Sequence, residues 1–94
     1  MRAVYKGTTI AESDATVVVE GNHYFPPESV RSEYLHSSVM VSLCAWKGVA
    51  RYYAIEVDGE RNTNAAWSYP LPWPWIRKIR RHVAFWKGVE VHAN

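Results

Sequence analysis

The stretch that decides the fold is residues 44–53, CAWKGVARYY, near the middle of a 94-residue chain. It predicts a strand, a tight turn at Lys47-Gly48 and a second strand, because glycine readily adopts the positive φ that short hairpin turns need. The preceding residues, 39–46, are apolar except for Ser42. Such a run is typical of a central strand buried on both faces. After the turn, apolar and polar residues alternate, and we expect the mostly apolar face, which carries Val49, Arg51, Tyr53, Ile55 and Val57, to meet the core.

The same aromatic-Lys-Gly motif occurs near both ends of the chain, at Tyr5-Lys6-Gly7 and Trp86-Lys87-Gly88. Together with the central copy, these motifs predict three bends of one sheet system. The β-branched run 16–19 and the Asp58-Gly59 pair add strand and hairpin signals. The sequence therefore predicts a single all-β domain over residues 1–94, mainly antiparallel.

One short helix is expected near residues 75–81. Pro74 suits the first position of a helix, and Ile76 and Ile79 follow helical spacing. We expect Trp75 to help these two isoleucines anchor the helix. Arg77, Lys78, Arg80 and Arg81 would then form a solvated face beside Trp73 and Trp75.

Composition excludes several classes of site. The single Cys44 excludes an intramolecular disulfide and a four-cysteine zinc site, and the four histidines are not spaced as metal ligands. We expect no metal and no cofactor. No run of 18 apolar residues is present, so no membrane-spanning segment is expected. An unpaired cysteine makes the reducing cytoplasm the expected compartment.

Four stretches in this order resemble the domain of unknown function 427 family: residues 23–28 (HYFPPE), 44–50 (CAWKGVA), 65–70 (AAWSYP) and 82–86 (HVAFW). The resemblance implies a fold similar to β-tent domains, in which two antiparallel sheets meet at an angle in an open, barrel-like arrangement. Relatives of that architecture include the ligand-binding domain of cereblon and the methionine sulfoxide reductase B enzymes. Some classifications label the family as nucleotidyltransferase-like, without an established reaction. The chain departs from zinc-binding β-tents in having one cysteine, and from the family motif in having Ala45 where proline is usual.

The favoured function is binding of a small, anionic, partly planar ligand in an aromatic-lined cleft. The ligand-binding candidates are two cations, which would hold an anionic group, and four aromatic residues: Arg31, Lys47, Trp46, Trp67, Tyr69 and Trp86. The resemblance to cereblon-like domains supports an aromatic pocket. The competing interpretation is that the aromatics are core and the cations are solvated.

Two other functional classes stay open. A small enzyme, of transferase or nucleotide-related type, would use Cys44 activated by a histidine such as His82, or Lys47 as nucleophile or acid/base. A protein-interaction module would form a homodimer through Trp73 and Trp75. Single-stranded nucleic acid would suit the basic cluster beside these tryptophans. The rest of the chain is slightly acidic, with seven basic against nine acidic residues once the four clustered cations are subtracted from 11, so we do not expect nucleic acid as a partner.

Overall fold

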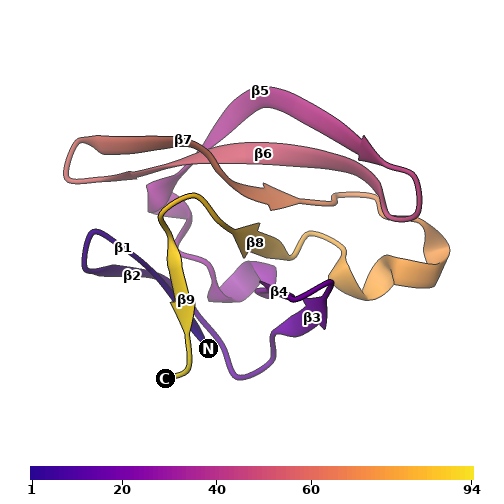
Figure 1. Ribbon diagram of the computed structural model, residues 1–94, viewed down its shortest axis with the longest axis horizontal. Helices are drawn as coiled ribbons and strands as arrows, with labels where there is room; N and C mark the ends of the chain where they lie inside the picture. Colours follow the sequence, from indigo (N-terminus) through magenta and orange to yellow (C-terminus); the bar gives the residue numbers. More distant parts are fainter.

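The computed structural model describes residues 1–94 and consists mainly of antiparallel strands (Figure 1), which confirms the predicted all-β class. A four-stranded sheet has the order β5-β6-β7-β8, and a three-stranded sheet has the order β2-β1-β9. A small hairpin, β3–β4, lies beside them. The strands are β1 (Arg2–Tyr5), β2 (Thr8–Glu12), β3 (Val17–Val19), β4 (Asn22–Tyr24), β5 (Leu35–Cys44), β6 (Gly48–Val57), β7 (Glu60–Ser68), β8 (Val83–Phe85) and β9 (Glu90–His92).

Three short 3₁₀ helices connect these strands: η1 (Pro27–Ser29), η2 (Ser32–Tyr34) and η3 (Pro74–Ile79). The helix expected near residues 75–81 is therefore present as η3, with a kink at Ile76. Ile76 and Ile79 are buried, as the spacing predicted, but Trp75 is 69% exposed. The expectation that Trp75 anchors the helix is wrong, because its indole lies on the outside and only its N–H reaches the β5–β6 turn.

The strand β5 lies at the edge of the four-stranded sheet, not at its centre. It pairs only with β6, and this pairing is interrupted between Ser37 and Val41. Val41 and Leu43 are exposed, the latter to 71%. The prediction of a strand buried on both faces is wrong because an apolar run does not report how many neighbours the strand has.

The strand β6 changes its buried face along its length. Near the turn, Ala50 is buried while Val49 and Arg51 are exposed, and further on Ile55 and Val57 are buried. The pairing with β7 shifts between Tyr53 and Ile55. Two steps along β6 match four along β7 at this point, and an even offset keeps the alternation of faces along β6. The predicted face therefore meets the main core at Ile55 and Val57 but is exposed at Val49 and Arg51, because the two cores lie against opposite faces of β6.

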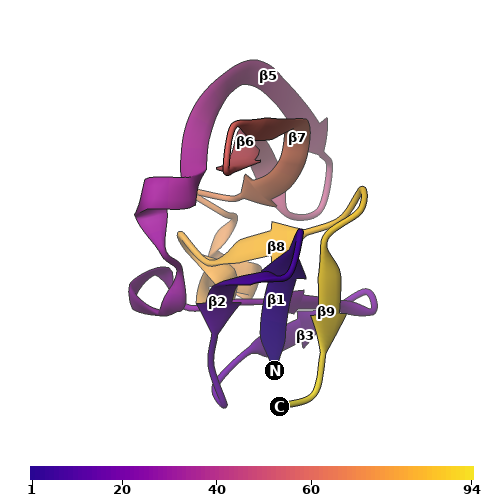
Figure 2. The same cartoon turned by 90° about the vertical axis from the view of Figure 1, so that its left-hand side faces the viewer.

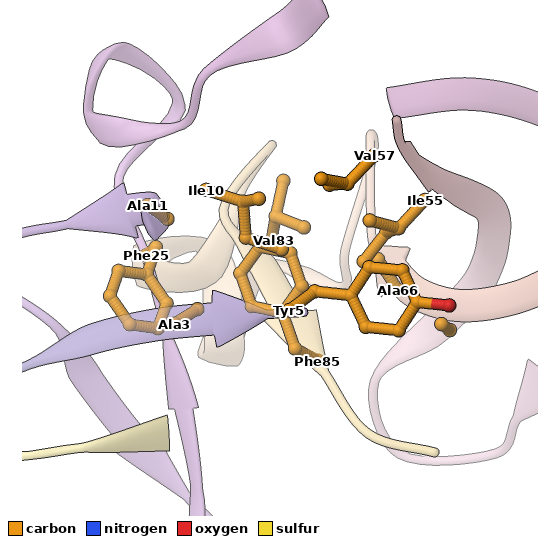
Figure 3. Close-up of a cluster of buried hydrophobic side chains, with 11 residues drawn as sticks. Ala3, Tyr5, Ile10, Ala11, Phe25, Ile55, Val57, Ala66, Val83 and Phe85 are labelled. Atoms are coloured by element: carbon orange, nitrogen blue, oxygen red, sulfur yellow. The ribbon is translucent and has the colours of Figure 1, made fainter. Parts of the chain in front are cut away.

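The main core lies between the four-stranded and three-stranded sheets (Figure 3). Phe25 contacts Phe85 edge to face at a ring separation of 5.5 Å. The backbone of Phe25 also exchanges two hydrogen bonds with Val83, at 2.8 and 2.9 Å, which joins the β4 end to β8. The three-stranded sheet places the two chain termini close together (Figure 2).

A second, smaller core lies under the β3–β4 hairpin and η3. Its buried members come from five segments of the chain: Val19, Tyr24, Ala50, Tyr69, Ile76, Ile79 and Ala84. Cys44 and Trp67 pack against it. This cluster supports the β5–β6 turn, where the candidate site lies.

Replacing Ile79 by alanine should cost about 2–4 kcal/mol of unfolding free energy, because the fully buried side chain leaves a cavity in the second core. Trp75→Ala serves as the control and should cost less than about 1 kcal/mol, since its ring is largely exposed. Chemical denaturation of both variants provides the measurement. Equal destabilisation by the two changes would contradict this account of η3.

Candidate functional site

The turn between β5 and β6 directs the Lys47 side chain inward, so that the residue is only 6% exposed. The Lys47 carbonyl accepts a hydrogen bond from Trp73 N at 2.9 Å, which fastens the proline-rich crossing to the turn. Gly48 has φ +123°, and a Cβ at this position would lie 3.4 Å from the Leu71 carbonyl oxygen and from the Pro72 Cα. Such distances are ordinary van der Waals contacts, so glycine is favoured here by its φ, which residues with a side chain rarely adopt.

A carboxylate from the β3–β4 turn meets Lys47. Lys47 Nζ forms an ion pair with Glu20 Oε1, and Trp46 Nε1 donates a hydrogen bond to Glu20 Oε2 at 3.2 Å. Glu20 and Gly21 both have positive φ, as expected for a two-residue hairpin turn. Two donors of different residues thus hold the two oxygens of one carboxylate, and the Glu20 side chain stays half-exposed.

Two aromatic rings complete the surroundings of the Lys47 ammonium. Nζ lies 5.3 Å from the ring centroid of Trp46 and 5.3 Å from that of Tyr69. At these distances the electron-rich faces of the rings attract the cation. The rings and the Glu20 carboxylate together replace much of the water that burial removes.

An aromatic row continues from Tyr69 across the sheet. Tyr69 lies 6.5 Å from Tyr24, which meets Trp67 edge to face at 6.2 Å, and Trp67 meets Trp86 at 5.5 Å. Trp67 Nε1 also donates to the Tyr24 hydroxyl at 3.1 Å. Tyr24 lies in β4 and Trp67 in β7, whereas Tyr69 and Trp86 directly follow β7 and β8.

Burial and neighbouring groups shift the pKa values of three residues in the site, Lys47, Tyr69 and Glu20. Burial works to lower the pKa of Lys47, but the Glu20 hydrogen bond and the electrostatic influence of Tyr24 and Tyr69 outweigh it, so the pKa is raised. Burial raises the pKa of Tyr69 to about 12. The hydrogen bond from Lys47 lowers the pKa of Glu20. At neutral pH the site therefore holds an ammonium, a carboxylate and a neutral phenol.

Five of the six predicted ligand-binding residues lie in this one region: Trp46, Lys47, Trp67, Tyr69 and Trp86. Arg31 does not join them. It lines a hollow of about 530 Å³ together with acidic residues of β2 and η1, and its backbone N–H binds the Ile10 carbonyl. None of the surface hollows is lined by the aromatic row. The aromatic cluster is therefore present, with its rings packed against one another.

Neither of the two catalytic candidates, Cys44 and Lys47, is hydrogen-bonded to a histidine. Cys44 is partly buried at the end of β5 and packs on the second core. The hydrogen bonds of the histidine rings run to Thr16, Arg80 and Ala93, not to Cys44. Lys47 is a charged, ion-paired ammonium, which has no lone pair for nucleophilic attack. No group of three or more His, Cys, Asp or Glu side chains forms a metal-binding arrangement.

Two residues of this site, Tyr24 and Glu20, were not predicted from the sequence. Tyr24 lies within the family-like stretch 23–28 and could have been found from its position beside a strand end. Glu20 carried no such signal, because it is 27 residues from Lys47 and sits in an ordinary hairpin turn. Only the tertiary packing of the β3–β4 hairpin on the β5–β6 turn brings these two charges together.

The chain belongs to the domain of unknown function 427 family, whose model matches residues 1–93. No curated protein matches the sequence. None of the helices has the length and apolar character needed to cross a membrane.

Replacing Glu20 by glutamine should lower the melting temperature at neutral pH, because Lys47 then loses its counterion. A lowered carboxyl pKa contributes stability above the unfolded-state value, near 4.5, and this contribution is lost as the pH falls through the folded-state value. The difference between parent and variant should therefore shrink below about pH 4.5. Glu33→Gln, an exposed carboxylate without an ion pair, is the matched control. A Glu20→Gln variant that melts like the parent at every pH would show that the pair contributes nothing.

Proposed function

We propose that this member of the family binds a small, anionic, partly planar ligand at Lys47 and Trp46. The observation that supports the proposal is the way in which Glu20 is held. Lys47 Nζ and Trp46 Nε1 each bind one oxygen of its carboxylate, so the two donors are already spaced for a carboxylate. A ligand carboxylate or phosphate fits the same donors when it replaces Glu20.

Glu20 suits the role of a displaceable internal counterion. Its side chain is half-exposed, whereas that of Lys47 is buried, so the carboxylate can leave for water at little cost while the ammonium cannot. Glu20 also sits at the tip of a two-stranded hairpin. Such a hairpin is weakly stabilised by its own pairing, and a small movement of its turn would free the two donors.

The planar part of the ligand would lie on an exposed indole. Trp46 is 41% exposed, although its indole N–H donates a hydrogen bond to Glu20 and its carbonyl accepts one from the Trp75 indole. An indole held in this way offers a flat apolar surface with little loss of side-chain freedom on binding. Tyr69, a neutral phenol beside the ammonium, can donate a further hydrogen bond to an anion. Arg31 has no part in this proposal, since it lines another hollow.

Binding is favoured over catalysis by the state of the two candidate nucleophiles. Lys47 is protonated, and no histidine hydrogen bond reaches Cys44. A free cysteine also agrees with the cytoplasmic location that we propose for the protein.

Titration calorimetry with adenosine 5′-monophosphate and with indole-3-carboxylate tests the proposal. Lys47→Met should weaken binding tenfold or more, a loss of about 1.4 kcal/mol or above. Glu20→Gln should strengthen binding, because the ligand no longer competes with an internal carboxylate. Lys78→Met, which removes an exposed cation of η3, is the matched control and should leave the affinity unchanged.

Two results would contradict the proposal: no binding of either anion to the parent protein, or equal affinities for the parent, Lys47→Met and Glu20→Gln variants. Weaker binding to Glu20→Gln than to the parent would show that Glu20 supports the ligand rather than competing with it.

A second proposal is self-association through Trp75. This ring is largely exposed, as is Leu71 on the same crossing, and exposed apolar groups mark contact surfaces. Trp73, the other predicted contact, is partly buried, and its indole N–H binds the Ala45 carbonyl at 2.9 Å. Sedimentation equilibrium should detect a dimer that Trp75→Ser abolishes and that Val18→Ser, a change at another exposed apolar residue, leaves intact. A constant monomer mass over a wide concentration range would refute the dimer.

A further inference from the structure

The outer face of the β5–β6 hairpin carries an exposed apolar surface that the proposed Lys47 site does not use. Leu43 pairs with Val49 across the hairpin, and Val41 pairs with Arg51. The three apolar members of these pairs are all exposed, and Leu71 on the adjoining crossing is 73% exposed. Ala50, between Val49 and Arg51, points the other way into the second core. This face is therefore separate from the one that buries Tyr69.

A hollow of about 350 Å³ opens on this face, within the range of small-molecule sites. It is lined by Val49, Arg51, Pro70, Leu71 and Trp73. The Trp73 wall is held by two hydrogen bonds of 2.9 Å, from its backbone N–H to the Lys47 carbonyl and from its indole N–H to the Ala45 carbonyl. The hollow is thus formed in advance, and a ligand need not order its walls.

Arg51 supplies the only charge among these walls. The ion pairs of the protein lie elsewhere, and the Arg51 guanidinium has no hydrogen bond to another side chain or to the backbone. Its strand neighbours are Val41 and Ser68, which carry no charge. A planar guanidinium with free donors binds a carboxylate in a two-pronged way. A second copy of the chain placed on this face by two-fold symmetry would instead bring one Arg51 towards the other.

We propose that this hollow is a second binding site, for a small aromatic carboxylate. The ring would lie against Trp73, Leu71 and Val49, and the carboxylate would pair with Arg51. The apolar walls and the single unpaired cation specify both halves of such a ligand. The proposal does not depend on the Lys47 site, because the two sites share no side chain.

Titration with 2-naphthoate, followed by ¹H–¹⁵N NMR on the full chain, tests the proposal. Naphthoate should shift the backbone amides of Val49, Arg51 and Leu71 and the indole N–H of Trp73. Arg51→Met should lower the affinity for naphthoate tenfold or more. Uncharged 2-naphthamide should bind the parent about as weakly as naphthoate binds the Arg51→Met variant. Arg77→Met, which removes an exposed arginine of η3, is the matched control and should keep the parent affinity. Leu71→Ser should also weaken binding, by removing an apolar wall without touching the charge.

The proposal is overturned if naphthoate leaves these four signals unchanged, or if Arg51→Met binds as tightly as the parent. It is also overturned if 2-naphthamide binds as tightly as naphthoate, since the site would then be apolar only. Shifts confined to Lys47 and the Trp46 indole would assign the ligand to the other site and would likewise refute this one.

Discussion

The burial of one lysine ammonium connects the separate parts of this small fold. Removing an ammonium from water is costly unless other polar groups replace the solvent. Here the replacement comes from Glu20 on the β3–β4 hairpin, from Trp46 in the turn itself and from Tyr69 beyond β7. Each partner belongs to a different segment. The positions of the hairpin, the turn and the crossing are therefore coupled through a single charge.

The aromatic residues serve both the core and the surface. Tyr24 and Tyr69 are buried, whereas Trp46 and Trp86 stay partly open, and Trp67 lies between these extremes. Edge-to-face contacts order the row without leaving space within it. The row is exposed at its Trp86 end and buried at Tyr69, and the hollow on the other side of the β5–β6 turn is built from different residues.

The extent to which this structure could be predicted from the sequence depends on how local each signal was. The turns at Lys6-Gly7 and Asp58-Gly59 have glycines with positive φ and join strands that pair with each other, so these two hairpins follow from local sequence. Lys87-Gly88 instead joins β8 to β9, which lie in different sheets. Whether a strand lies at a sheet edge is a long-range property, and β5 was misplaced for that reason. The two ends of β6 are buried on opposite faces because a different core lies against each end, and no pattern within β6 itself records this.

The residues of the candidate site also differ in whether a local sequence signal predicts them. Trp46, Lys47, Trp67, Tyr69 and Trp86 could be chosen because they lie in compact motifs, and the fold brings them together. Arg31 was chosen by residue type alone, and the fold places it on another hollow. Glu20 belongs to the site but was not predicted, because its partner Lys47 is 27 residues away and no local pattern indicates the pair.

The choice of lysine at position 47 is itself informative about function. A buried ion pair is weak evidence for stability, because replacing such a pair by well-packed apolar residues is often neutral or stabilising. Trp46, Tyr69 and the second core already offer apolar surroundings in which an uncharged side chain would pack. The structural requirement at this turn falls on Gly48, through its φ, and on the Lys47 carbonyl, which any residue would supply. Packing alone therefore does not account for the ammonium. The anion binding that we propose would account for it, and the half-exposed Glu20 carboxylate marks the position at which we propose that the anion binds.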